Sequence, residues 1–95
     1  MSGYIIVQIN ITNKEQYSEY LNQVTSIAEK YGGEYIVRGG KTKTMLGSWD
    51  YERTVVIKFP TYNAALEWYN CEEYEPIKKI REDNSEGNLI IIEGV

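Results

Sequence analysis

Hydrophobic and polar residues follow two different periods along this chain. They alternate toward the end of residues 4–11, and residues 34–38, 53–59 and 89–95 are short runs rich in β-branched and aromatic residues. Because successive side chains of a strand point to opposite faces and such residues favour strands, these segments are predicted to be four β-strands. Between the first and second strands, and between the third and fourth, apolar residues recur every three or four positions, which predicts amphipathic helices.

The first helix has well-defined ends in the sequence. Asn13 is a favourable N-cap, and Gln16 three residues later completes a capping-box pattern. Apolar residues then recur at helical spacing over residues 17–31. The pair at 32–33 is Gly-Gly, which predicts the end of the helix because glycine accepts the left-handed conformation found there.

The third strand is followed by a second helical region. Pro60 lacks a backbone N–H and ends the strand, and Thr61 is a favourable N-cap for the helix behind it. A break at residues 70–71 precedes another helical segment, in which Pro76 is tolerated only within a first turn. Residues 83–88 are predicted to be a polar loop before the last strand.

The predicted element order is β-α-β-β-α-β, within one domain that spans residues 1–95. Two right-handed βαβ crossovers, each leaving room for a strand between, give an antiparallel four-stranded sheet with both helices on one face. The sequence therefore predicts an α+β fold of the ferredoxin-like type.

The helices leave the other face of this sheet uncovered. If the alternation of strand two is unbroken, that face is half apolar and holds Tyr4, Ile6, Gln8, Asn10, Glu34, Ile36, Arg38, Thr54, Val56 and Lys58. Such a mixture favours a homodimer formed face to face through the sheet, with a partly hydrated interior. Gly39-Gly40 is expected to form a bulge that redirects Arg38, and pairing is expected to resume over residues 41–46.

Composition narrows the choice of partners and compartments. The net charge of −4 and the absence of like-charge runs argue against binding to nucleic acids or to anionic membranes. One cysteine, no signal-type segment and no apolar run long enough to cross a bilayer predict a cytoplasmic protein. The chain has no histidine, which removes the commonest general base and transition-metal ligand, so no metal or cofactor is expected.

The best candidate site is a set of arginines and aromatic residues. A guanidinium group suits a carboxylate or phosphate, and aromatic side chains exclude water from such a group. The candidate ligand-binding residues are Tyr17, Arg38, Trp49, Arg53, Tyr74 and Arg81. The alternative is that the arginines form structural ion pairs with Glu34, Asp50, Glu72 or Glu73, which would fasten helix to sheet or protomer to protomer.

Several motifs, in order and at matching separations, resemble the domain of unknown function 1330 family over essentially the whole chain. They are YGGEYIVRGG at 31–40, GSWD at 47–50, the strand at 53–59, AALEWY at 64–69, and EYEP at 73–76 followed by Arg81. The chain departs from the family pattern at Tyr51, Cys71 and Glu72, where proline, serine and proline are more usual. The resemblance implies a dimeric α+β barrel, in which two ferredoxin-like protomers pack sheet to sheet. It implies no reaction, because the activity of the family is unassigned.

Three functions remain open at this stage. The first is a homodimeric protein that acts as a cofactor-independent enzyme on a small organic acid. The second is a non-catalytic binding module for such a molecule. The enzyme would use Tyr74 as proton donor, Trp49 to line the site and Arg81 to hold the anion. Proton transfer could otherwise fall to a carboxylate such as Glu72 or Glu73. The third, which is the alternative to both, is a structural or interaction protein whose main role is to form the dimer.

Overall fold

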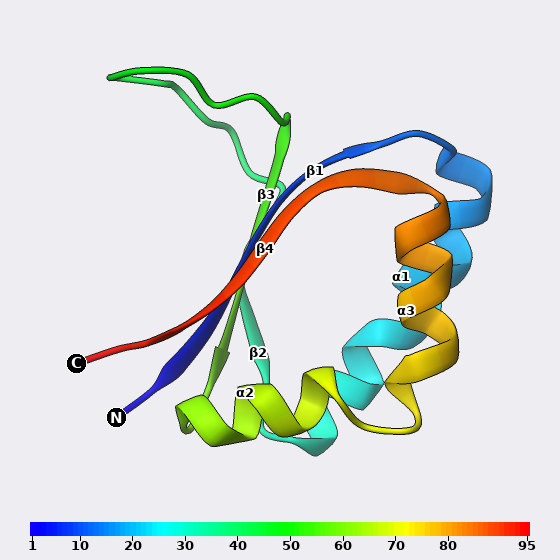
Figure 1. Ribbon diagram of the computed structural model, residues 1–95, viewed down its shortest axis with the longest axis vertical. Coiled ribbons are helices and arrows are strands. Elements are labelled where there is room, and N and C mark those ends of the chain that lie inside the picture. Colours follow the sequence, from blue (N-terminus) through cyan, green and yellow to red (C-terminus); the bar gives the residue numbers. More distant parts are fainter.

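The computed structural model describes residues 1–95 as one layer of helices against one sheet (Figure 1). The elements in chain order are β1 (Gly3–Ile11), α1 (Lys14–Lys30), β2 (Glu34–Arg38), β3 (Arg53–Phe59), α2 (Tyr62–Tyr69), α3 (Tyr74–Asp83) and β4 (Ser85–Glu93). The four strands are antiparallel in the order β2-β3-β1-β4, and all three helices lie on the same side of the sheet. The predicted ferredoxin-like α+β fold is confirmed.

The helix ends follow the local sequence signals. The Asn13 side-chain oxygen accepts a hydrogen bond from the Gln16 N–H at 3.1 Å, and the Thr61 hydroxyl accepts one from the Ala64 N–H at 3.0 Å. These caps satisfy backbone donors that the first helical turn leaves free. Gly32, just after the C-cap of α1, adopts the left-handed conformation with φ of +83°. Pro76 lies in the first turn of α3, as predicted.

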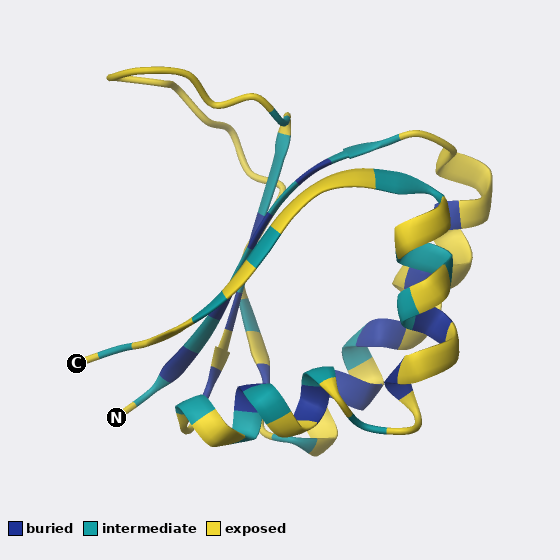
Figure 2. Ribbon diagram, viewed as in Figure 1, coloured by how far each residue is buried: buried dark blue, intermediate teal, exposed yellow.

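The core lies between the helices and the sheet (Figure 2). Alternate residues of the central strand β1 point into it, and Ile5, Val7 and Ile9 are all less than a tenth exposed. At one end of this core, the Trp68 ring lies 5.5 Å from that of Phe59 and 4.3 Å from that of Tyr74, measured between centroids. Aromatic residues of this size contribute a large share of the buried apolar area of so small a domain.

The predicted alternation of β2 is wrong, because a β-bulge interrupts it at Ile36. Tyr35 pairs with Ile57, but the next paired residue is Val37, which lies opposite Val56. One extra residue reverses the direction of every side chain beyond it. Arg38 therefore lies opposite Val55 on the helix-covered face, whereas the alternation placed it on the uncovered face and the bulge was expected at Gly39-Gly40.

Residues 39–52, which we call the arm, form no further strand, so the pairing expected over residues 41–46 is also wrong. The last ladder bond runs from the Gly39 N–H to the Thr54 carbonyl at 2.8 Å. Beyond it the arm projects from the sheet on the side away from the helices (Figure 1). Its tip is strongly exposed, at 82% for Met45 and 94% for Leu46.

The predicted polar loop at residues 83–88 is wrong as well, since β4 begins at Ser85. Its polar first half pairs with the central strand from Ser85 opposite Ile11 to Asn88 opposite Gln8. The ladder to β1 outweighs the weak strand preference of these residues. Gly87 permits the pairing, because a side chain there would collide with the Gln8 carbonyl.

The face of the sheet away from the helices stays partly apolar. Val37, Ile90 and Ile92 are 38%, 52% and 47% exposed on strands β2 and β4. Ile90 and Ile92 lie opposite Ile6 and Tyr4 in the β1–β4 ladder, so this apolar surface is continuous across strands. No helix in the structure has the length and apolar character needed to cross a membrane.

Candidate ligand-binding cavity

A cavity of about 170 Å³ lies between the helix layer and the sheet. Its floor is the covered face of the sheet, mainly Ile5, Val7 and Ile9 of β1 with Val55 and Ile57 of β3. These residues are placed there by the two-residue period of the strands and by the register that pairs Ile5 with Ile57 and Val7 with Val55. The middle of the floor is therefore apolar.

Helix α1 and strand β2 add aromatic walls to the cavity. Tyr17, Tyr20 and Val24 lie on the buried stripe of α1, three or four residues apart, and all three line the cavity. Tyr35 lines it from β2, and Trp68 lines it from α2. Trp68 is 1% exposed, and its indole Nε1–H has no hydrogen-bond partner in the protein.

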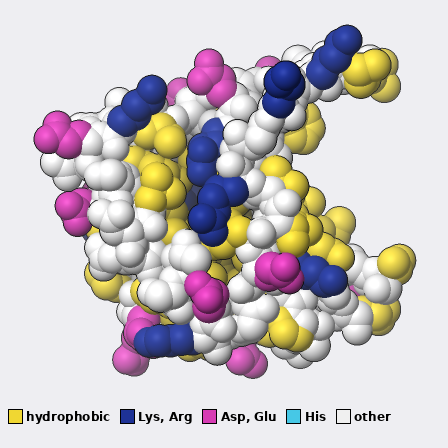
Figure 3. Space-filling view, turned by 180° about the vertical axis from the view of Figure 1, so that it is seen from behind, with side chains coloured by type: hydrophobic (Ala, Val, Ile, Leu, Met, Phe, Trp, Pro, Cys, Tyr) yellow, Lys and Arg dark blue, Asp and Glu magenta, His cyan; other side chains and the backbone are white.

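All three arginines of the chain line this one cavity. Arg38 comes from the end of β2, Arg53 from the start of β3 and Arg81 from α3. Lys and Arg side chains gather in the middle of the face seen in Figure 3, with hydrophobic side chains beside them.

None of these arginines forms an ion pair. The three salt bridges of the protein use only lysines, namely Lys30–Glu73, Lys78–Glu75 and Lys79–Asp83. Within the protomer, the ion pairs considered for Arg38, Arg53 and Arg81 with Glu34, Asp50, Glu72 or Glu73 are therefore absent.

The backbone at Gly39 makes room for one guanidinium group, and an aromatic ring holds a second. Gly39 has φ of +67°, a conformation that glycine adopts without strain, and a side chain there would force the Arg53 guanidinium to shift. The Arg38 guanidinium lies over the Tyr35 ring, 4.2 Å from its centroid. Such cation–π contacts hold the arginine in place without neutralising its charge.

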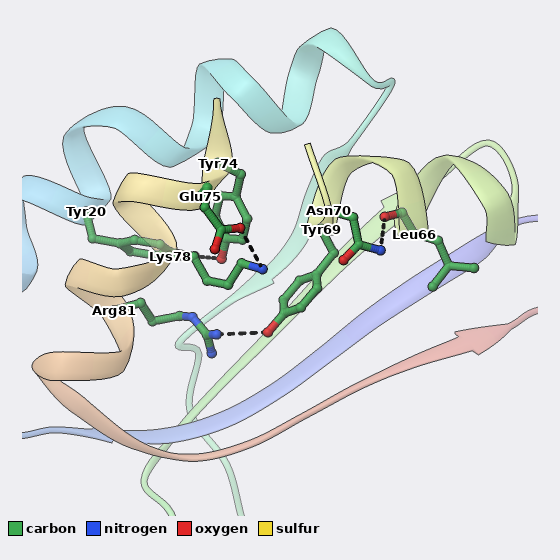
Figure 4. Close-up of polar contacts among 8 residues, drawn as sticks. All are labelled: Tyr20, Leu66, Tyr69, Asn70, Tyr74, Glu75, Lys78 and Arg81. Atoms are coloured by element: carbon green, nitrogen blue, oxygen red, sulfur yellow. Dashed lines mark hydrogen bonds and ion pairs between the residues drawn. The ribbon is translucent and has the colours of Figure 1, made fainter. Parts of the chain in front are cut away.

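Arg81 is held by a tyrosine from the neighbouring helix. Its Nη2 donates a hydrogen bond to the Tyr69 hydroxyl at 3.1 Å, and Figure 4 shows the side chain reaching from α3 toward Tyr69 on α2. The Nε atoms of Arg81 and Arg53 are buried and have no hydrogen-bond partner. Each buried donor without a partner costs free energy, so the cavity carries donors that the protein itself leaves unsatisfied.

The tyrosines around the cavity stay neutral. Burial raises the pKa of Tyr17, and the nearby charges of Arg53 and Arg81 only partly oppose this. Burial likewise raises the pKa of Tyr35 above its usual range, against the opposing charge of Arg38. Because these phenols keep their protons at neutral pH, they act as hydrogen-bonding groups and do not neutralise the arginines.

Four of the six predicted site residues meet at the cavity, namely Tyr17, Arg38, Arg53 and Arg81. Tyr74 is fully buried and does not line the cavity, and its hydroxyl oxygen lies 2.7 Å from that of Tyr20, which does. Figure 4 draws this hydrogen bond between α1 and α3. Burial raises the pKa of Tyr74 to about 12, although its hydrogen bond to Tyr20 opposes this shift.

Trp49 lies elsewhere. Its indole Nε1 donates to the Thr54 hydroxyl at 3.0 Å, and Thr54 pairs with Gln8 in the β1–β3 ladder. Trp49 and Thr54 line a shallow groove along the arm together with residues 42–46. Neither of them lines the arginine cavity. Glu72 and Glu73 lie at an exposed acidic surface with Cys71, also outside the cavity.

The sequence reasoning missed Tyr20, Tyr35 and Trp68 as cavity residues. Their spacing matches that of the core face of a helix or strand, and the same spacing directs a side chain toward a cavity inside the core. The sequence signal that could have found Tyr20 and Trp68 is that both are polar-tipped aromatic residues on the buried faces of the helices. No cluster of three or more His, Cys, Asp and Glu residues that could hold a metal ion is present.

Solved structures with the same fold were found at low sequence identity. The methylated RPA0582 protein of Rhodopseudomonas palustris is 16% identical, with a TM-score of 0.80 over 99% of this chain and 81% of that chain. A dimeric ferredoxin-like protein of unknown function from Jannaschia sp. CCS1 is 12% identical, with a TM-score of 0.73 over 100% and 99% of the two chains. SnoaB, a cofactor-independent oxygenase from Streptomyces nogalater, is 8% identical, with a TM-score of 0.65 over 99% and 93%.

At these identities the likeness establishes the fold alone. No curated protein sequence gives a significant match to the chain. Residues 2–95, by contrast, match the family described as "Domain of unknown function (DUF1330)", in agreement with the motifs at residues 31–40 and 47–50. The chain therefore belongs to the DUF1330 family.

Proposed function

We propose that this protein binds a small organic anion in the cavity lined by Arg38, Arg53 and Arg81, and that it does so as a homodimer. The observation that carries the proposal is that every arginine of the chain lines one apolar cavity and none has a carboxylate partner. In an acidic protein with 14 Asp and Glu residues, carboxylates are abundant enough to pair with them elsewhere.

The energetic argument starts from the cost of partly buried charge. Removing a guanidinium from water without a counter-charge costs several kcal/mol, and a paired one costs far less. A ligand carboxylate would accept hydrogen bonds from the unsatisfied Nε atoms of Arg53 and Arg81, and charge-assisted bonds of this kind are about twice as strong as neutral ones. The organic part of the ligand would then lie on the apolar floor formed by β1 and β3.

The proposed dimer would form through the uncovered face of the sheet. Exposed Val37, Ile90 and Ile92 form an apolar surface that water solvates poorly, and the arm projects on the same side. A standard interface buries about 800 Å² per partner, roughly an eighth of the 6227 Å² surface of this chain. The relative from Jannaschia sp. CCS1 is described as dimeric, which supports the same arrangement here.

A catalytic role toward the bound acid is the second candidate. Tyr20 lines the cavity and shares a short hydrogen bond with Tyr74, so Tyr20 would deliver a proton to the ligand and Tyr74 would support it. SnoaB, a cofactor-independent oxygenase of the same fold, supports the idea that this architecture suits chemistry without a cofactor. Mass spectrometry of organic acids incubated with the protein tests this role, with the Tyr20→Phe variant as the comparison.

The binding proposal is tested by thermal unfolding with a panel of organic acids. An acid at ten times its Kd stabilises the folded state by ~1.4 kcal/mol, which raises the Tm of a domain of this size by roughly 6–11 °C. The increase is expected in the native protein and in the Lys79→Gln control, which removes one charge from an exposed ion pair. It is expected to disappear in Arg53→Gln and Arg81→Gln. If no acid raises Tm, or if both arginine variants respond like the control, the proposal is wrong.

A further inference from the structure

The size of the cavity limits what the arginines can hold. Its volume is about 170 Å³. An apolar protein cavity of about 150 Å³ is large enough for one benzene molecule. The cavity therefore accommodates a single six-membered ring, and because it is open to solvent on one side, small substituents on the ring can extend beyond this volume.

The cavity has a charged end and an apolar end. Along β3, Arg53 lies four residues before Ile57, which corresponds to about 13 Å of strand. Arg38 lies opposite Val55, near the Arg53 end. Trp68 packs against Phe59, two residues beyond Ile57, so it marks the opposite end. A bound molecule would thus meet positive charge at one end and the buried Trp68 side chain at the other.

The walls between these ends are aromatic. Tyr17, Tyr20 and Tyr35 line the cavity together with Trp68. Aromatic side chains pack against an aromatic ring in offset or edge-to-face arrangements and favour it over a saturated group of the same size. The apolar floor of isoleucine and valine offers no partner for a second charge in the middle of the ligand.

From these features we infer that the ligand is a single-ring aromatic carboxylic acid that carries a hydrogen-bond acceptor on the side of the ring opposite the carboxylate. The carboxylate accepts from the arginines, the ring lies among the tyrosines, and the acceptor receives the unpartnered Nε1–H of Trp68. This inference rests on the proposed function, because it specifies the class of anion that the same cavity takes.

Calorimetric titrations with a matched series of acids test the inference. The series is 4-hydroxybenzoate, benzoate, cyclohexanecarboxylate, hexanoate, succinate and inorganic phosphate. We expect 4-hydroxybenzoate to bind about fivefold more tightly than benzoate, which corresponds to one added neutral hydrogen bond. Benzoate should bind more tightly than cyclohexanecarboxylate, which has the same carboxylate but no aromatic ring, and succinate and phosphate should bind least.

A direct readout of Trp68 avoids the risk of altering a core residue. The Trp49→Phe variant leaves Trp68 as the only tryptophan, and Trp49 does not line the cavity. The indole N–H proton resonance of this variant should move downfield with 4-hydroxybenzoate and much less with benzoate, because only the first ligand offers an acceptor.

The outcomes separate the two proposals. If none of the acids binds, the proposed function fails and the inference fails with it. If hexanoate or cyclohexanecarboxylate binds as tightly as benzoate, the anion site stands and the aromatic class is overturned. If 4-hydroxybenzoate gains nothing over benzoate and leaves the indole resonance in place, the role given to Trp68 is overturned.

Discussion

Replacing Arg53 by methionine should make the ligand-free protein more stable. Arg53 is partly buried, forms no ion pair, and has a buried Nε without a hydrogen-bond partner. An unsatisfied buried donor costs about 1–3 kcal/mol. Methionine keeps most of the apolar stem and adapts to irregular space, so the loss of packing should stay below about 1.5 kcal/mol.

The balance of these two terms gives an expected stabilisation of about 1 kcal/mol. For a domain of this length, that corresponds to an increase in Tm of ~4–8 °C. Urea unfolding monitored by circular dichroism gives the free energy of unfolding directly. Lys79→Met is the matched control: it removes a positive charge from an exposed side chain and should change the free energy by no more than about 0.5 kcal/mol.

The same substitution should abolish the stabilisation by organic acids. A variant that is more stable without ligand and insensitive to it would show that Arg53 is retained for binding at a cost in stability. If Arg53→Met instead lowers the free energy of unfolding by more than about 1 kcal/mol, the arginine is a structural element and the reasoning about an unsatisfied donor is wrong.

Three further predictions follow from the structure. Gly39→Ala should destabilise the protein by at least ~1 kcal/mol and weaken acid binding, because it strains a left-handed residue and displaces the Arg53 guanidinium; Gly40→Ala, with open space around it, is the control, and equal effects in the two variants would contradict the argument. The raised pKa of Tyr74, about 12 against 10.0 in an unfolded chain, means that the folded state retains a proton that the unfolded state loses. Tyr74 should therefore contribute up to roughly 2.7 kcal/mol to the fall in stability between pH 10 and 12, in addition to the falls from Tyr17 and Tyr35, whose pKa values are also raised. Urea unfolding should show a smaller fall in a Tyr74→Phe variant than in the native protein, and equal falls would assign the loss to other groups. Ile90→Lys on the uncovered sheet face should shift the sedimentation profile toward monomer, whereas Asn22→Lys on the exposed side of α1 should leave it unchanged; a monomeric native protein would refute the dimer.

Much of the fold was predictable because its signals are local. A capping oxygen acts three residues along the chain, and the periods of strands and helices lie within single segments. Asn13, Thr61 and Pro60 therefore marked element ends correctly, and the element order then restricted the topology through the handedness of the crossovers. The family motifs added agreement over the whole chain.

The side of the sheet on which Arg38 lies and the start of β4 were harder to predict, because both depend on strand register. The bulge at Ile36 reverses the side on which Arg38 lies, and nothing within residues 34–38 signals a residue that the partner strand leaves unpaired. The same applies to the polar start of β4, which forms a strand because the central strand β1 offers it a ladder.

By itself, the sequence determined the elements, the ferredoxin-like fold and the residue types suited to an anion. Only the tertiary structure decided that Arg38, Arg53 and Arg81, from three different elements, share one cavity without a carboxylate. It also separated Trp49, on the arm, from Trp68, at the apolar end of that cavity. The physical reason is range: local hydrogen bonds and side-chain periods set each element, whereas register and packing between distant segments decide which side chains face one another.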